Sequence, residues 1–211
     1  MYWTLHAFAD FLMRLISHCE YVGLENIPHA PPYILVSNHL ALFDSPLVLT
    51  VCPHVSRAFA AAKHKRNPLF YALLTVMGSV WVRRGEVDRG ALEEALAVLQ
   101  RGEVLGIAPE GTRSPTHALQ KAKIGAAYLA TRADVPLVPL AITGTEKIKY
   151  ELPRLRRAHV RVVVGKPFRL PENGHVRGQK LREYTNIIMH RIAELLPEEY
   201  RGVYAQAVGK T

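Results

Sequence analysis

Short apolar runs alternate along this chain with longer segments whose apolar residues recur at helical spacing. The short runs predict strands near residues 21–24, 33–37, 57–60, 79–83, 104–108, 137–142 and 159–165. The longer segments predict helices near residues 2–19, 45–52, 68–77, 88–101, 119–133 and 176–196. This alternation predicts an α/β fold, with a largely parallel sheet covered by helices on both faces.

Length and composition agree with a single globular domain. The chain has 211 residues, of which 49% are apolar, and it contains no internal repeat or low-complexity tract. This is enough material for a sizeable hydrophobic core. Within it we expect an amphipathic helix over residues 1–20, the main domain over 21–200 and a loose polar tail over 201–211.

The charge balance is basic. The chain has 27 Lys and Arg residues against 18 Asp and Glu residues, a formal net charge of +9. Such an excess favours an anionic partner, which can be a nucleic acid, a phosphorylated substrate or an acidic bilayer. The two cysteines, Cys19 and Cys52, are too few for a disulfide scaffold, so a reducing cytoplasm is the simplest setting.

A polar motif follows the strand predicted at 33–37. His39 precedes Asp44 by five residues, and Asp44-Ser45-Pro46 is typical of a helix start. A strand-to-helix turn of this length can fold Asp44 onto one ring nitrogen of His39, which leaves the other nitrogen free to accept a proton. An ordinary interpretation is also open, with a hydrogen-bonded structural histidine and a helix cap.

Three further blocks carry polar or special residues. Residues 109–114 follow a predicted strand and form a loop that could present backbone N–H groups to an anion, although its residue types are also common in turns. A second strand ends in Arg83 and Arg84. A third, over 135–140, is entered through prolines, which favours an edge or a strand start.

These four blocks, in this order, resemble the glycerolipid acyltransferase family, in particular its bacterial 1-acyl-sn-glycerol-3-phosphate acyltransferase branch. The family motifs are N-H-x4-D, G-x-x-F-I-D-R, F-P-E-G-T-R-S and V-P-[IV]-[VI]-P-V, with a Lys-x-Gly after the third. The chain departs from them at Arg83 and Ala108. The matching positions are Asn38, His39, Asp44, Gly78, Trp81, Arg84, Pro109 to Ser114, Lys123, Gly125, Val135, Pro136 and Pro139.

The resemblance implies a mixed sheet of about seven strands with an N-terminal helical element beside the active site. It also implies acyl transfer from a thioester without an acyl-enzyme, with His39 as general base and Asp44 as its orienting partner. Backbone N–H groups around Gly111, or a nearby side chain, would hold the oxyanion. The other implied roles are acceptor binding by Glu110 and Thr112, and phosphate binding by Arg84 and Arg113 with Lys121 or Lys123.

The favoured acceptor under this resemblance is lysophosphatidate, which would become phosphatidate. Glycerol 3-phosphate, other lysophospholipids and amine-bearing lipids remain alternatives. The donor is acyl-CoA or acyl carrier protein, because both present a phosphopantetheine thioester. No cofactor or metal is expected beyond this donor.

Other functional classes fit the sequence less well. A hydrolase would use the same His–Asp pair with water or a serine, but there is no G-x-S-x-G motif. A nucleic-acid-binding module would explain the charge, yet no helix-turn-helix, zinc or RNP signature is present. Cys52, His54 and His64 lack the spacing of a usual metal site. A non-catalytic membrane lipid-binding relative remains an alternative of a different class.

The first 20 residues are amphipathic as a helix. Such a helix either lies in a membrane interface or packs on the domain. We expect no membrane span and no signal peptide, because charges interrupt the apolar runs. We therefore expect a peripheral protein on the cytoplasmic face of the cell membrane, held on an anionic surface by this helix and by Lys63, Lys65 and Arg66. The apolar face of the helix comprises Leu5, Phe8, Phe11, Leu12, Leu15, Ile16 and Cys19.

Overall fold

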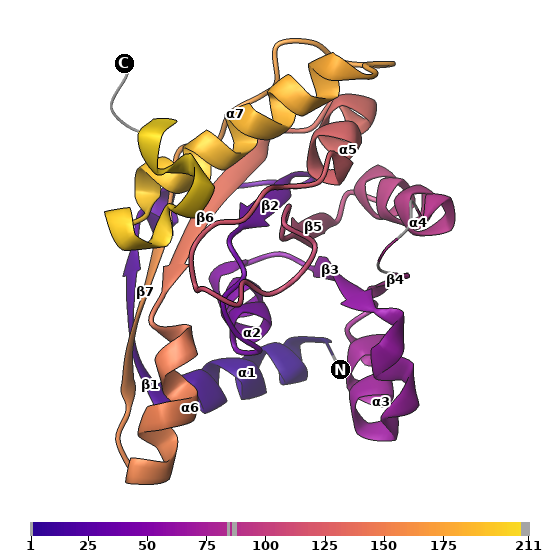
Figure 1. Ribbon diagram of the computed structural model, residues 1–211. Helices are drawn as coiled ribbons and strands as arrows, with labels where there is room; N and C mark the ends of the chain where they lie inside the picture. Colours follow the sequence, from indigo (N-terminus) through magenta and orange to yellow (C-terminus); the bar gives the residue numbers. More distant parts are fainter. Residues whose placement is uncertain (1, 84, 86–87, 208–211) are drawn as a thin grey trace.

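A seven-stranded sheet runs through the centre of the protein in a computed structural model, which describes residues 2–83, 85 and 88–207 (Figure 1). The strand order is β1-β7-β6-β2-β5-β3-β4. Neighbouring strands are parallel except β6 and β7, which are antiparallel. The expected α/β fold with a mixed, largely parallel sheet is therefore confirmed. The strands are β1 (Ser17–Val22), β2 (Ile34–Ser37), β3 (Ser56–Ala61), β4 (Val80–Val82), β5 (Val104–Ile107), β6 (Leu137–Thr143) and β7 (Ala158–Val164).

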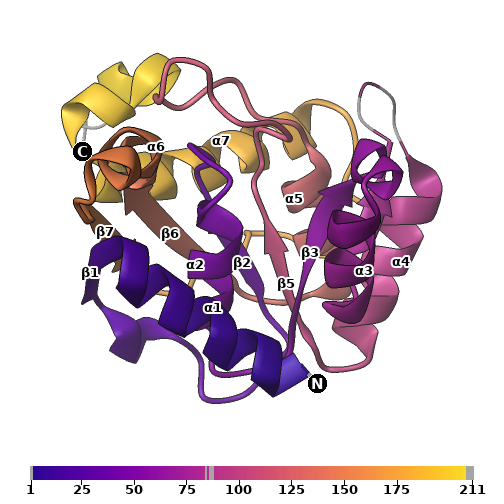
Figure 2. The same cartoon turned by 90° about the horizontal axis from the view of Figure 1, so that it is seen from below.

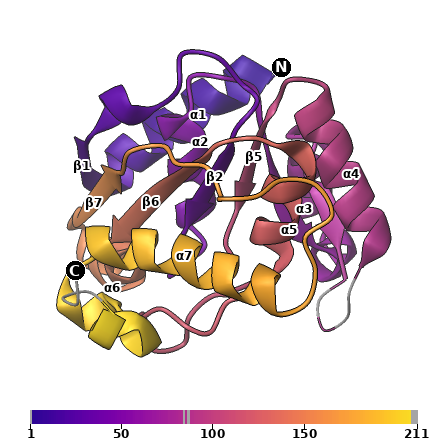
Figure 3. The same cartoon turned by 90° about the horizontal axis from the view of Figure 1, so that it is seen from above.

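Helices cover both faces of this sheet. The view from below shows α1 and α2 in front of the strands, and the view from above shows α5 and α7 on the opposite face (Figure 2, Figure 3). The α-helices are α1 (Tyr2–Ile16), α2 (Asp44–Val51), α3 (Pro68–Val76), α4 (Arg89–Gln100), α5 (Gly125–Ala133), α6 (Ile148–Glu151) and α7 (Gln179–Leu195). The 3-10 helices are η1 (Leu24–Asn26), η2 (Ala62–Arg66), η3 (Thr145–Lys147), η4 (Leu152–Arg154), η5 (Glu198–Tyr200) and η6 (Gly202–Ala207). Across the described residues, no helix combines the length and the hydropathy that crossing a bilayer requires.

Each face of the sheet has its own hydrophobic core, and the central strand β2 contributes to both. Ile34 and Val36 belong to the core formed with α4, α5 and α7. Leu35, together with Tyr33 just before the strand, belongs to the core formed with α1 and α2. Successive side chains of a strand point to opposite faces, so a strand covered on both sides must be apolar throughout. This is why the sequence there is a continuous apolar run.

Helix α1 ends at Ile16, earlier than the sequence predicts, and β1 follows it directly. Ser17 is buried, and its hydroxyl donates to the carbonyl of Met13 at 2.6 Å in the last turn of the helix. Cys19 and Tyr21 then pack on the core at the two-residue spacing of a strand. The expected boundary between a helix over 1–20 and a domain from residue 21 is therefore corrected, because β1 pairs with β7 in the main sheet.

The helix predicted over 119–133 begins only at Gly125. The N–H of Gln120 donates to the carboxylate of Glu110 at 2.9 Å, and the N–H of Lys123 donates to the carbonyl of Pro109 at 2.8 Å. In a helix over 119–133 the N–H of Lys123 would donate to the carbonyl of Leu119, so its bond to Pro109 replaces a helical bond, and tertiary contacts override the local helical pattern.

The C-terminal segment is packed where a loose tail was expected. Tyr204 lies in η6, is 8% exposed and belongs to the core beside α7. Gly202 has a φ of +49°, and a Cβ there would lie 2.1 Å from the carbonyl oxygen of Leu119. The expectation for 201–211 is thus corrected over residues 201–207, while 208–211 lie outside the described residues.

Candidate active site

The turn between β2 and α2 brings His39 and Asp44 together. The Nδ1 atom of His39 lies 2.8 Å from Oδ2 of Asp44. The side chain of His39 is 18% exposed, whereas that of Asp44 is 3% exposed. With Asp44 ionised, Nδ1 carries the hydrogen and donates it, which leaves Nε2 as a proton acceptor. The contact expected from the five-residue spacing is present, and the catalytic roles of the two residues remain predictions.

Asp44 receives hydrogen bonds at both of its oxygens. The N–H groups of Leu40 and Ala41 donate to Oδ2 at 2.5 and 2.8 Å. The hydroxyl of Thr145 donates to Oδ1 at 2.5 Å, from η3 beyond the end of β6. A buried carboxylate is costly unless it is hydrogen-bonded, and these donors supply that compensation. Sequence reasoning missed Thr145, because it lies 101 positions from Asp44 and no local pattern marks it.

Asn38, the first residue of the motif, ties β2 to β6. Its Nδ2 group donates to the carbonyl of Ile142 at 2.8 Å, and its Oδ1 accepts the N–H of Ile142 at 2.8 Å. The side-chain amide therefore takes the place of a backbone partner just beyond the β2–β6 ladder, which ends at the pair Ser37 and Leu140. This pairing anchors the base of the turn that carries His39.

Glu110 connects the second polar block to the first. Its Oε1 atom accepts the backbone N–H of His39 at 3.2 Å, and its Oε2 atom accepts the N–H of Gln120 at 2.9 Å. The N–H of Ser114 also donates to the carbonyl of His39 at 2.8 Å. Glu110 is 3% exposed, and burial raises its pKa above the ordinary value, although the two N–H donors oppose the shift. The structure thus gives this carboxylate two backbone partners, and its expected contact with an acceptor remains a prediction.

The remaining predicted site residues occupy different environments. Gly111 has a φ of +70°, and its own N–H donates to the carbonyl of Ala108 at 2.9 Å. A Cβ at this glycine would lie 3.3 Å from Nζ of Lys123, so the lysine side chain crosses the glycine closely. Thr112 and Arg113 are exposed, and Lys123 is exposed as well. Arg84 lies outside the described residues.

A largely apolar cavity of about 700 Å³ opens beside His39 and Asp44. Gly111 and Lys123 line the same cavity. Its size falls in the usual range of small-molecule sites, roughly 300–1,000 Å³. Its apolar walls come from α1, α2, α3, β3, α4 and β5, and they include Phe8, Leu12, Val48, Phe59, Leu73, Leu92 and Ile107.

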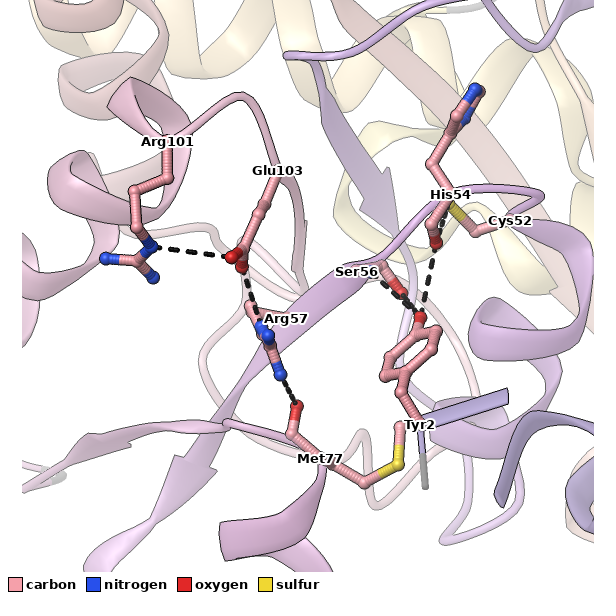
Figure 4. A network of polar contacts seen from close by, with 8 residues as sticks. All are labelled: Tyr2, Cys52, His54, Ser56, Arg57, Met77, Arg101 and Glu103. Carbon is pink, nitrogen blue, oxygen red and sulfur yellow. Dashed lines mark hydrogen bonds and ion pairs between the residues drawn. The ribbon is translucent and has the colours of Figure 1, made fainter. Parts of the chain in front are cut away.

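A polar network ties the walls of this cavity together along β3 (Figure 4). The hydroxyl of Tyr2, in α1, accepts the N–H of Ser56 at 2.8 Å. Arg57 donates through Nε to Oε2 of Glu103 at 2.7 Å and through Nη1 to the carbonyl of Met77, after α3, at 2.8 Å. Burial raises the pKa of Glu103, but its bonds with Arg57 and Arg101 outweigh burial and hold that pKa below the ordinary value. The start of α1 and the end of α3 are therefore both fixed to β3.

No three His, Cys, Asp or Glu side chains gather as a metal site in the part of the chain that the structure describes. Cys52 and His54 are neighbours, since the thiol of Cys52 lies 3.5 Å from the carbonyl of His54. The ring of His64 lies against Phe70.

Comparisons with known proteins agree with the motifs. A profile of the Acyltransferase family matches residues 18–143, more than half of this chain. The 1-acyl-sn-glycerol-3-phosphate acyltransferase of Borreliella burgdorferi is 33% identical over 130 residues, which cover 58% of this chain and 50% of that protein. The enzyme of the same name from Bacillus subtilis is 25% identical over 173 residues, which cover 81% of this chain and 84% of that protein.

A solved structure also resembles this fold. The crystal structure of the 1-acyl-sn-glycerophosphate acyltransferase PlsC from Thermotoga maritima aligns with a TM-score of 0.71 at 26% identity, covering 92% of this chain and 79% of that chain. The chain spans about half the length of the first curated relatives it matches. The family resemblance identified from the four motifs is confirmed.

Proposed function

Because this chain belongs to the Acyltransferase family, we propose that it transfers a fatty acyl group from an acyl thioester to the free hydroxyl of lysophosphatidate and so forms phosphatidate. The names of the relatives support this choice of acceptor. The observation that carries the proposal is the His39–Asp44 pair at 2.8 Å, which lines a largely apolar cavity of about 700 Å³. A base beside an apolar cavity suits a substrate that joins a hydroxyl to a fatty chain.

In the proposed mechanism the acceptor itself supplies the nucleophile. Nε2 of His39 takes the proton of the acceptor hydroxyl as its oxygen attacks the thioester carbonyl. Asp44 holds the imidazole in one tautomer and stabilises the imidazolium that forms. The tetrahedral intermediate then breaks its carbon–sulfur bond, and the leaving thiolate receives the proton from His39. No acyl-enzyme forms, because the protein contributes no nucleophile.

The oxyanion and the phosphate need positive partners. The N–H of Gly111 already donates to Ala108, so we propose the neighbouring Lys123 for the developing negative charge. Arg113, which is exposed on the loop that contains Gly111, is proposed to bind the phosphate of the acceptor together with Arg84. Arginine suits this role, because its planar guanidinium can pair with two phosphate oxygens.

The apolar cavity is proposed to hold an acyl chain during the reaction. Each buried methylene contributes about 0.8 kcal/mol, so a long chain gains substantial binding energy from such walls. Phe8 on α1 and Leu73 on α3 line the cavity and are also 59% and 42% exposed at the surface. The cavity therefore adjoins an apolar surface through which a bilayer-bound lipid could enter.

That surface supports a peripheral membrane location. Helices α1 and α3 lie on the same side of the sheet (Figure 2). Helix α1 packs on the domain through Ala9, Met13 and Ile16, which are buried, so a different apolar stripe remains at the surface. Lys63, Lys65 and Arg66 lie in η2 immediately before α3, where they could meet an anionic leaflet, which we propose is the cytoplasmic one. The exposed apolar residues of the two helices include Trp3, Phe8, Phe11, Leu15, Leu69, Tyr71 and Leu73.

A direct assay tests the proposal and also identifies both substrates. Purified protein is incubated with labelled acyl-CoA in one arm and labelled acyl carrier protein in the other, against lysophosphatidate, glycerol 3-phosphate, neutral lysolipids and amine-bearing lipids. Phosphatidate, identified by mass spectrometry, is the expected product. Lipid binding without turnover in either arm would instead favour a non-catalytic lipid-binding protein.

A further inference from the structure

Thr145 reaches the candidate catalytic pair from a distant part of the chain. It lies at the first position of η3, just after β6, and is 1% exposed. Its hydroxyl donates to Oδ1 of Asp44 at 2.5 Å, whereas the donors from the turn itself, at His39, Leu40 and Ala41, all meet Oδ2. Each oxygen of the carboxylate is thus held from a different segment.

Because the two oxygens of Asp44 are held from different segments, the orientation of the carboxylate plane is restricted. A carboxylate bonded at one oxygen alone can still rotate about its Cβ–Cγ bond, because that torsion is soft. A second bond at the other oxygen fixes the plane of the group. Hydrogen bonds to a charged acceptor are short and strong, so the Thr145 hydroxyl is well suited to hold that plane against the ring of His39.

Thr145 is itself held in place on both sides. Gly144, the residue before it, has a φ of +88°, and a Cβ there would lie 2.0 Å from the carbonyl oxygen of His159 in β7. Glu146, the residue after it, is buried and accepts the hydroxyl hydrogen of Tyr200 at 2.7 Å. The tight turn and the C-terminal segment therefore fix the backbone from which Thr145 reaches Asp44.

We propose that Thr145 is a positioning residue that acts through Asp44 to keep the His39 imidazole aligned for proton transfer. This inference rests on the proposed acyl transfer, in which His39 is the base. Thr145 is buried and does not line the cavity, so its contribution is expected in the chemical step and not in substrate binding.

The test compares Thr145→Val, which keeps the shape of the side chain but removes the hydroxyl, with Thr145→Ser, which keeps the hydroxyl. For the valine variant we expect kcat to fall about ten- to a hundredfold, the usual effect of losing a hydrogen bond to a charged group, with both KM values little changed. Thr145→Ser should recover most of the activity. Thr185→Val is the matched control, since Thr185 is also buried but donates to the carbonyl of Leu181 within α7.

A pH profile separates positioning from a purely structural role. The hydrogen bond from Thr145 offsets part of the negative charge of the Asp44 carboxylate. When this bond is removed, the carboxylate attracts the protonated imidazole of His39 more strongly. The acid limb of kcat/KM should therefore move to higher pH in Thr145→Val, while Thr145→Ser and Thr185→Val keep the wild-type profile.

The outcomes distinguish failure of this inference from failure of the proposed function. An active, folded His39→Ala variant would remove the proposed mechanism and the role of Thr145 together. An inactive His39→Ala beside a Thr145→Val variant with wild-type kcat and pH profile would overturn the role of Thr145 alone. If Thr145→Val and Thr145→Ala both lose their fold, as judged by thermal unfolding, the hydroxyl is structural and the inference is wrong.

Discussion

Glu110 accepts the backbone N–H of His39 at 3.2 Å, so a buried carboxylate from one motif holds the backbone of the candidate base in another, 71 positions away. Its second oxygen accepts the N–H of Gln120 at 2.9 Å. Through these two hydrogen bonds the Glu110 side chain links the turn that carries His39 to the segment that carries Gln120, in addition to any contact with substrate.

The burial of Glu110 predicts a pH-dependent stability. Burial raises the pKa of Glu110, and a carboxyl with a raised folded-state pKa contributes its full stability below its unfolded pKa and loses it as the pH rises through the folded-state pKa. The melting temperature of the wild type relative to Glu110→Gln should therefore fall as the pH rises above the ordinary pKa of a glutamate. Glu94→Gln, an exposed change on α4, is the control and should show no such trend. A difference between wild type and Glu110→Gln that does not change with pH would contradict the prediction.

The second prediction concerns the His39–Asp44 pair. His39→Ala should fold normally and lose about 10²–10⁴ of kcat, which is the usual contribution of a general base. Asp44→Asn should also lose much activity, because the tautomer of His39 is no longer held. The double variant should be little worse than His39→Ala, since the two residues act as a unit. Near-normal turnover in folded His39→Ala would end the catalytic assignment.

The third prediction concerns phosphate recognition by Arg113 and Arg84. Replacing either arginine by alanine should mainly raise KM for the phosphorylated acceptor. A charged hydrogen bond is worth roughly 1.5–3 kcal/mol, which corresponds to a loss of about ten- to a hundredfold in kcat/KM. Arg161→Ala, which removes an exposed arginine paired with Glu20 at the sheet edge, is the control. A defect confined to the acyl donor would move these arginines to the donor site.

The fourth prediction concerns membrane attachment. Phe8, Phe11 and Leu15 are 59%, 62% and 59% exposed, so changing all three to serine should leave the fold intact and release the protein from anionic liposomes in a sedimentation assay. Activity on vesicle-bound acceptor should fall more than activity on a soluble, short-chain acceptor. High salt should weaken wild-type binding only in part, because the apolar contribution is not screened.

Val203→Ser provides the matched control for the triple variant. Val203 is 70% exposed but lies in η6, which contacts α7 on the opposite face of the sheet from α1, so liposome binding should be unchanged. The membrane proposal is wrong if wild-type protein does not sediment with anionic liposomes or if the triple variant sediments equally well.

The sequence alone determined the features that depend on neighbouring residues. Strands β2, β5 and β6 are continuous apolar runs, and such runs follow from burial on both faces. The pairing of His39 with Asp44 was also predictable, since a strand-to-helix turn of this length can bring one side chain back to the other. The family resemblance also rested on motifs that are each short and local.

Tertiary structure alone decided the features that depend on partners far along the chain. Gln120 and Lys123 lie in a segment with helical apolar spacing, yet their N–H groups donate to Glu110 and Pro109, and the helix begins only at Gly125. The composition around Tyr204 predicts a polar tail, but in the structure its side chain is buried in the core. Thr145 shows the same principle at the candidate site, since no local pattern relates it to Asp44. Only the pairing of β6 with β2 in the folded sheet brings that hydroxyl to the carboxylate.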